Sequence, residues 1–172
     1  EALGNELTDD ALAGFEAVLF RDDLPSPADV AKDLVDGKVA DACYPIIAGL
    51  LERQRCDRSI EDLPTDTRTV GLLLCLDGSL RLTSEQGDAL FETLFRSLRL
   101  DEPGLEAIAK LWLEPALEAG HEHISGLHRF LYDDCWASVN VRLVQQWLMA
   151  LASVHNVIEV ELVEFLARSD KL

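Results

Sequence analysis

The sequence lacks the short motifs that mark most nucleotide-dependent and hydrolytic enzymes. It contains no glycine-rich phosphate loop, no GxSxG nucleophile elbow and no dinucleotide-binding fingerprint. The remaining enzymatic alternative is a cysteine-dependent reaction at Cys135, with His128 seven residues earlier as a base. Sequence spacing alone does not bring these two side chains together, so we expect a protein without enzymatic activity.

The sequence also lacks paired cysteines and long apolar runs. Cys43, Cys56, Cys75 and Cys135 stand singly, without a CxxC pair, which excludes the usual zinc-ribbon and thioredoxin-type sites. We expect four reduced thiols and therefore an intracellular, reducing compartment such as the cytoplasm. No apolar run approaches the roughly 18 residues of a membrane span. Because the chain begins at Glu1 rather than methionine, we expect a processed product or a domain excised from a longer protein.

Basic residues are scarce. The chain has 15 Lys and Arg against 32 Asp and Glu, a net charge of −17 at pH 7. This charge repels phosphate backbones, so we expect no direct nucleic-acid partner and instead a partner with a basic segment. Residues 1–36 hold ten acids and two bases, which predicts either a solvated acidic face or a docking surface for Lys and Arg. The candidate partner-binding acids are Asp9, Asp10, Asp22 and Asp23.

One short basic cluster interrupts this acidity, the stretch RQRCDR at residues 53–58. It is about one helical turn long, and Glu61 and Asp62 follow it closely. The pattern therefore indicates a solvated helix end rather than a nucleic-acid patch.

The apolar residues, which make up 48% of the chain, recur at helical spacing nearly everywhere. Helix start signals agree with this spacing, since Ser26 precedes Pro27 and Asp29 follows in the first turn. We find no alternating strand pattern. The expected helices cover residues 8–20, 27–36, 40–54, 66–76, 84–99, 102–118, 126–134, 140–153 and 157–169. This predicts an all-α fold of about nine helices in stacked antiparallel hairpins, either a compact bundle or a short HEAT-like helical repeat array.

The length of 172 residues fits one domain of ordinary size, so we expect residues 1–172 to form a single helical domain. The stretch EDLPTDTRT at residues 61–69 is the candidate internal hinge.

The stretch CLDGSLRLTSEQGDALFETLF, residues 75–95, has the outline of a calcium-binding hand. Neither register of such a loop supplies enough oxygen ligands, so a calcium site is excluded. Instead, Asp77 and Gly78 predict the end of one helix, and Thr83 with Gln86 predicts a capping box at the start of the next. The stretch is expected to be a helix–turn–helix connection.

Over residues 70–111, the Asp-Gly turn, the capped helix with Glu85 and the following LFRSLRLDEPGLEAIAKL resemble the TerB-like helical family. That family is associated with tellurite resistance and with domains attached to co-chaperones. The resemblance implies a helical interaction or regulatory module. It also gives an alternative function, a metal- or stress-response module that would use Asp77, Glu85 and the histidine-containing stretch at residues 118–128. A second acid–glycine turn follows in that family, but this chain has His155 and Asn156 at the corresponding place.

The stretch EAGHEHISGLH at residues 118–128 gathers histidines and glutamates. Glu118 and His121 have the ExxH spacing of carboxylate-bridged metal bundles, and His123 lies nearby, but such a site needs two ExxH motifs. We expect a polar inter-helix loop and no metal or other cofactor, with these three residues as the candidate ligands.

Three tryptophans lie in the C-terminal half, and Trp147 belongs to a helical core stripe. Trp112 and Trp136 are either core residues or anchors in a binding groove, because tryptophan is enriched at binding hot spots. We expect a non-enzymatic adaptor or regulatory domain that binds a basic or amphipathic helical segment of another protein. The groove would lie between helices of the C-terminal half, with Trp112 and Trp136 as anchors and acids at the rim.

Overall fold

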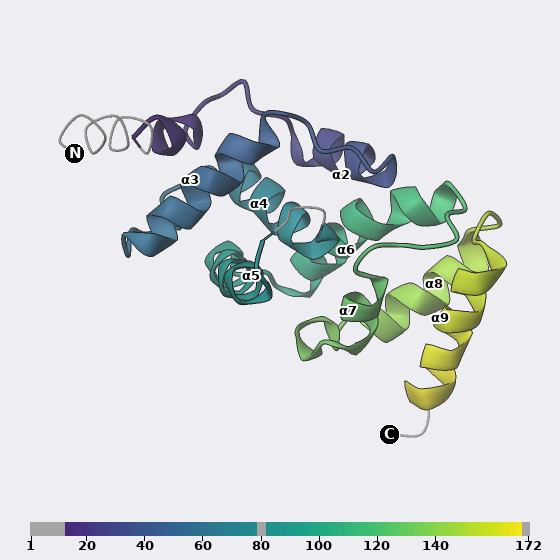
Figure 1. The fold of residues 1–172 in the computed structure, drawn as a ribbon. Coiled ribbons are helices and arrows are strands. Elements are labelled where there is room, and N and C mark those ends of the chain that lie inside the picture. Colours follow the sequence, from purple (N-terminus) through teal and green to yellow (C-terminus); the bar gives the residue numbers. More distant parts are fainter. Residues whose placement is uncertain (1–12, 79–81, 170–172) are drawn as a thin grey trace. The chain divides into compact units, whose positions relative to one another are not determined.

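The protein is all-helical. A computed structural model describes residues 13–78 and 82–169, and within them every regular element is a helix and none is a strand (Figure 1), which confirms the predicted fold class. Residues 13–18 are helical as well. The elements are α2 (Pro27–Val35), α3 (Cys43–Arg55), α4 (Thr65–Asp77), α5 (Ser84–Leu98), α6 (Glu102–Glu118), α7 (Leu127–Tyr132), the 3-10 helix η1 (Asp134–Trp136), α8 (Asn140–Ala150) and α9 (Asn156–Ser169).

Contacts divide the chain into two units, unit 1 (Glu1–Arg99) and unit 2 (Leu100–Leu172). Residues 61–64 form the turn before α4, and residues 65–69 are already helical. The predicted hinge at 61–69 and the single domain over 1–172 stay predictions.

The predicted helix caps at Ser26, Gly78 and Thr83 are confirmed. Ser26 Oγ accepts a hydrogen bond from the backbone N–H of Asp29 at 3.2 Å, and Pro27 occupies the first turn of α2. Thr83 Oγ1 accepts from the N–H of Gln86 at 3.3 Å at the start of α5. Gly78 ends α4 in the left-handed conformation at φ 68°, a conformation that glycine adopts without steric cost.

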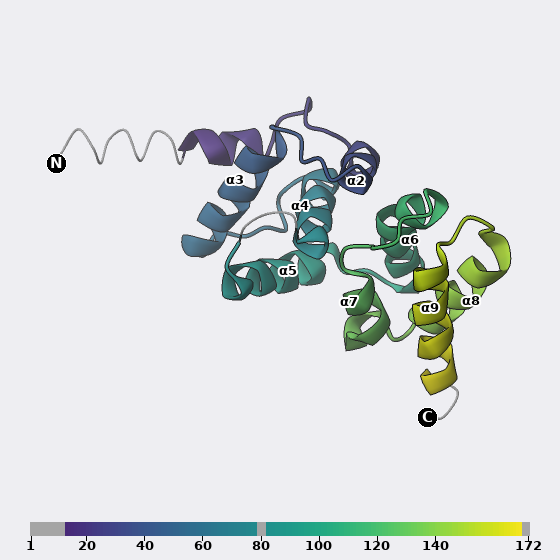
Figure 2. The same ribbon diagram turned by 45° about the vertical axis from the view of Figure 1, so that its right-hand side comes forward.

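Unit 1 is built around α4. This helix packs against α2, α3 and α5, and both views place it in the middle of the unit (Figure 1 and Figure 2). Gly71 allows the close approach, because a Cβ at this position would lie 2.5 Å from Leu50 Cδ1 and 3.1 Å from Leu94 Cδ1. The leucine run that follows, Leu72 to Leu74, is fully buried.

Unit 2 has an aromatic core. The rings of Phe130 and Trp136 lie 5.7 Å apart between centroids, and those of Phe130 and Trp147 lie 5.3 Å apart. Trp147 Nε1 donates a hydrogen bond to Glu114 Oε1 at 2.9 Å, so the buried indole N–H keeps a partner. The helices α8 and α9 pack against each other as a hairpin.

None of the helices in the described residues is long and apolar enough to cross a membrane. All four cysteines belong to the described residues, and none of them forms a disulfide, as the sequence predicts. The cellular compartment stays a prediction.

Candidate functional site

Of the four acids predicted to bind a partner, two fall within the described residues. Asp22 and Asp23 are exposed in the turn before α2, whereas Asp9 and Asp10 lie outside the described residues. Arg21 Nε donates to Asp23 Oδ1 at 2.7 Å, and this hydrogen bond holds the pKa of Asp23 below its usual range. The Asp23 charge is therefore already partly balanced by its neighbour.

The candidate metal ligands lie at helix ends. Asp77 is buried at the end of α4 and Glu85 is exposed in the first turn of α5, both in unit 1. In unit 2, Glu118 is exposed at the end of α6, and the loop after it carries a half-buried His121 and an exposed His123. Within residues 13–78 and 82–169, no group of three His, Cys, Asp or Glu side chains is placed to hold a metal ion.

The two candidate tryptophan anchors are core residues. Trp136 is fully buried and Trp112 is only 5% exposed, with ring centroids 6.1 Å apart. Neither indole offers a surface that a partner could cover, which corrects the prediction that they anchor a partner. The physical reason is that tryptophan is used both in cores and at binding hot spots. The spacing of apolar residues around it is the same in both cases, so the sequence does not distinguish them.

The groove of unit 2 lies beside a different pair of aromatic rings. A cavity of about 380 Å³ opens between the end of α7, η1, the start of α8 and the last turns of α9. Tyr132 and Phe165 line it, with their rings edge to face at 5.8 Å, and Tyr132 is 40% exposed. Asp133 and Asp134 line it as well. Arg168 lines the groove too and pairs with Glu164 of α9 at 3.4 Å. The groove therefore combines an accessible aromatic wall with two carboxylates and one guanidinium that already has a carboxylate partner.

The carboxylates of the groove differ in their surroundings. Asp133 Oδ2 accepts a hydrogen bond from Arg129 Nε at 3.0 Å, one turn earlier in the chain. Asp134 is exposed in η1. Asn140 links the start of α8 to the end of α7 at the base of the groove, because its Nδ2 donates to the backbone carbonyl of Leu131 at 3.1 Å. One carboxylate is thus oriented by an arginine, and the other faces water.

Cys135, the candidate nucleophile, is half-buried beside this groove. Burial, together with the charge of Asp133, raises the pKa of its thiol to about 11. The ring of His128 packs against Tyr132 at 4.6 Å between centroids. Because the thiolate is the reactive form, a thiol with so high a pKa is a poor nucleophile at neutral pH.

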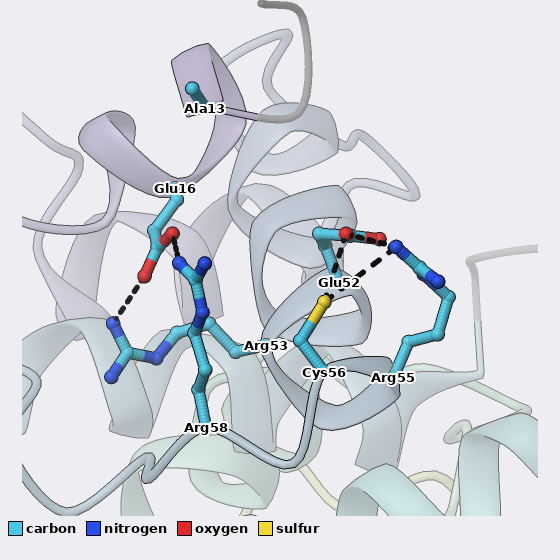
Figure 3. Close-up of a pocket in the computed structure, with 7 residues that line it drawn as sticks. All are labelled: Ala13, Glu16, Glu52, Arg53, Arg55, Cys56 and Arg58. Carbon is cyan, nitrogen blue, oxygen red and sulfur yellow. Dashed lines mark hydrogen bonds and ion pairs between the residues drawn. The ribbon is translucent and has the colours of Figure 1, made fainter. Parts of the chain in front are cut away.

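A second cavity, of about 290 Å³, lies in unit 1 at the end of α3 (Figure 3). The helical residues 13–18 contribute Ala13 and Glu16 to it. The remaining lining comes from the predicted basic cluster and the residue before it: Glu52, Arg53, Arg55, Cys56 and Arg58.

Arg53 is the centre of this cluster and is buried, which corrects the prediction of a solvated helix end at this residue. Its Nη1 donates to Glu16 Oε1 at 2.9 Å, and its Nε donates to the backbone carbonyl of Ser59 at 2.8 Å. Its Nη2 donates to Asp62 Oδ1 at 2.8 Å. Arg58 pairs with the second oxygen of Glu16 (Figure 3). One guanidinium thus joins residues 13–18, α3 and the loop before α4.

The other half of the cluster is formed by Glu52. Arg55 Nε donates to Glu52 Oε2 at 2.7 Å, and the Cys56 thiol donates to Glu52 Oε1 at 3.2 Å (Figure 3). These hydrogen bonds, that of Arg55 first, lower the pKa of Glu52 to about 2. A lowered carboxylate pKa favours folding at neutral pH, and this contribution is lost as the pH falls from about 4 through the folded-state value.

The charges in this cavity balance. The guanidinium groups of Arg53, Arg55 and Arg58 face the carboxylates of Glu16, Glu52 and Asp62. Because each cation already has a carboxylate, the cavity has no surplus positive charge for a phosphate or another anion. We interpret it as a structural ion-pair network rather than a ligand site.

The contact with Glu52 is expected to slow alkylation of Cys56. A carboxylate acceptor stabilises the neutral thiol, and the hydrogen bond to Glu52 raises the pKa of Cys56. In Glu52→Gln this negative charge is gone, so the thiolate fraction rises and iodoacetamide reacts severalfold faster at pH 8, by roughly threefold for each pKa unit. Peptide-resolved mass spectrometry separates Cys56 from the other cysteines.

The matched control for Cys56 is Asp57→Asn, which removes one negative charge from the next residue. Asp57 has a left-handed backbone at φ 52°, a conformation that asparagine tolerates. We expect its alkylation rate to stay close to that of the unchanged protein. Equal rates in Glu52→Gln and Asp57→Asn would contradict a specific thiol–carboxylate contact.

Comparison with protein-family models, curated proteins and solved structures finds no match to this chain. The resemblance of residues 70–111 to the TerB-like family stays a prediction.

Proposed function

We propose that the protein is a non-enzymatic interaction domain that binds a basic segment of another protein in the groove of unit 2. One observation carries the proposal: the groove places the exposed ring of Tyr132 next to Asp133 and Asp134. An aromatic wall with carboxylates at its edge suits a segment that combines an apolar side chain with lysine or arginine.

The size of the groove supports a short segment. Its volume of about 380 Å³ lies at the lower end of ligand pockets, which suits one or two side chains. The net charge of −17 supports the basic character, since a negative protein speeds its encounter with a positive segment. In this proposal, the exposed ring of Tyr132 supplies the affinity by covering an apolar side chain, and the carboxylates supply orientation and speed of association.

The proposal is tested with short synthetic peptides that contain one leucine or phenylalanine among lysines, and with matched peptides in which glutamine replaces lysine. Only the lysine peptides are expected to bind.

Raising the salt from about 0.05 to 0.5 M should slow association strongly, because exposed charges are screened over about 10 Å at 0.1 M. Tyr132→Ala should raise the dissociation rate about tenfold or more, the size of a lost hot-spot contact. Stopped-flow fluorescence anisotropy measures both rates.

The matched control compares two pairs of acids with equal charge change. Asp133→Asn with Asp134→Asn removes two charges at the groove, and Asp22→Asn with Asp23→Asn removes two charges in unit 1. We expect the first pair to slow association more than the second. Equal slowing would mean that total charge alone steers the peptide, and an unchanged dissociation rate in Tyr132→Ala would refute the groove as the site.

A further inference from the structure

The helix α9 is apolar on two sides. Its inward face carries Ile158, Leu162 and Phe165, which are buried in unit 2. Its outward side carries Val157, Val160 and Val163, which are 52%, 58% and 50% exposed. Single exposed apolar residues are normal, but a surface helix is expected to be polar on its outer side. Three valines at three-residue spacing on one helix therefore need an explanation.

The outward residues have the spacing of a helix–helix seam. Val160, Val163 and Ala167 follow one another at steps of three and four, the spacing of the two core positions in a heptad repeat. Glu159 precedes the first of these positions and Glu164 follows the second, and both are exposed. In a helical pair these neighbouring positions flank the apolar seam and carry the charges that select the partner. The outward face thus consists of an apolar stripe between two carboxylates.

A second copy of this chain does not suit the face. In a parallel pair of α9 helices, Glu159 of one copy would meet Glu164 of the other. The parallel arrangement sets acid against acid, which destabilises a helical pair. In an antiparallel arrangement the net charge of −17 on each copy still opposes association of two copies. A helix with lysine or arginine at the flanking positions would instead pair with Glu159, and it would share Glu164 with Arg168, which pairs with Glu164 at 3.4 Å.

We propose that the outward face of α9 docks a basic amphipathic helix of another protein. The partner helix presents leucine, isoleucine or valine to the Val160–Val163–Ala167 stripe and lysine or arginine to Glu159 and Glu164. This surface adjoins the groove, which takes Phe165 from the inward side of α9 and Arg168, the ion-pair partner of Glu164, from its last turn. Docking on α9 does not require the groove to be a binding site.

The test uses the full chain and two synthetic helical peptides of about three heptads. Both have leucine at the core positions, and the flanking positions carry lysine in one peptide and glutamate in the other. Isothermal titration calorimetry is expected to detect binding of the lysine peptide only. Val160→Thr with Val163→Thr keeps the branched shape of the side chains but removes apolar surface, and it should weaken binding at least tenfold. Met149→Gln is the control, because Met149 is an apolar residue of α8 with 89% exposure, and it should leave binding unchanged.

A charge exchange separates this contact from general attraction to an acidic protein. Glu159→Lys with Glu164→Lys should transfer the preference from the lysine peptide to the glutamate peptide. Tyr132→Ala should leave binding of the helical peptides unchanged, so the α9 face and the groove can fail independently. Binding that is indifferent to both the threonine and the lysine exchanges would overturn the proposal. Self-association in sedimentation equilibrium that the threonine exchanges abolish would also overturn it, in favour of a second copy.

Discussion

Replacing Trp136 with alanine is expected to lower the free energy of unfolding of unit 2 by about 3–5 kcal/mol, the range for a buried tryptophan truncated to alanine. The side chain is fully buried, and its ring lies against Trp112 and Phe130. Alanine would leave a cavity that these rings can only partly fill. Urea denaturation followed by tryptophan emission measures the loss, because Trp112 and Trp147 remain as reporters in unit 2.

The control for this variant is Met149→Ala, which truncates a side chain that is 89% exposed. We expect it to change the free energy of unfolding by less than about 0.5 kcal/mol, as exposed substitutions usually do. If Trp136→Ala kept the stability of the unchanged protein and weakened peptide binding instead, the assignment of Trp136 to the core would be wrong.

Replacing Arg53 with alanine is expected to lower the free energy of unfolding of unit 1 by about 2–4 kcal/mol. The change removes the donor to the Ser59 carbonyl and the partner of Glu16 and Asp62. The loss lies below that of a fully buried ion pair because the Asp62 side chain is 54% exposed and regains water. Urea denaturation followed by far-UV circular dichroism measures it.

Two controls show whether the geometry of Arg53 matters. Arg55→Ala removes an equal charge from an exposed side chain of the same helix, and we expect a loss of less than about 0.5 kcal/mol. Arg53→Lys keeps the charge but lacks the planar fork of donors, so it should recover only part of the stability. If Arg53→Ala and Arg55→Ala lowered the free energy of unfolding equally, the hydrogen bonds of Arg53 would add nothing beyond the effect of removing one positive charge.

Much of the fold could be predicted because its signals are local. Ser26 and Thr83 define helix starts through hydrogen bonds within three residues, and the predicted and observed starts agree there. The helix predicted from residue 40 begins instead at Cys43. This start places Pro45 within the first turn of α3, where the N–H that proline lacks has no intrahelical acceptor.

The sites could not be predicted in the same way because they combine residues that are distant in the sequence. Glu16 lies 37 residues before Arg53, and neither residue type marks the other as its partner. The groove joins Tyr132 of α7 to Phe165 of α9. Apolar periodicity identifies the face that a helix buries, but it does not identify the helix that lies opposite. The outward valines of α9 are not predictable as a surface for a related reason, since the buried residues Ile158, Leu162 and Phe165 alone account for an amphipathic helix.

The burial of α4 has a consequence for how unit 1 opens. Its leucine run is fully buried, and α2, α3 and α5 all pack against it, so no small local motion brings water to its backbone. Amide protons of the leucine run in α4 can exchange with solvent only when neighbouring helices separate, whereas exposed helix ends, including the first residues of α4, can fray independently. Slow exchange in α4 is therefore a measure of the cooperative opening of unit 1 as a whole.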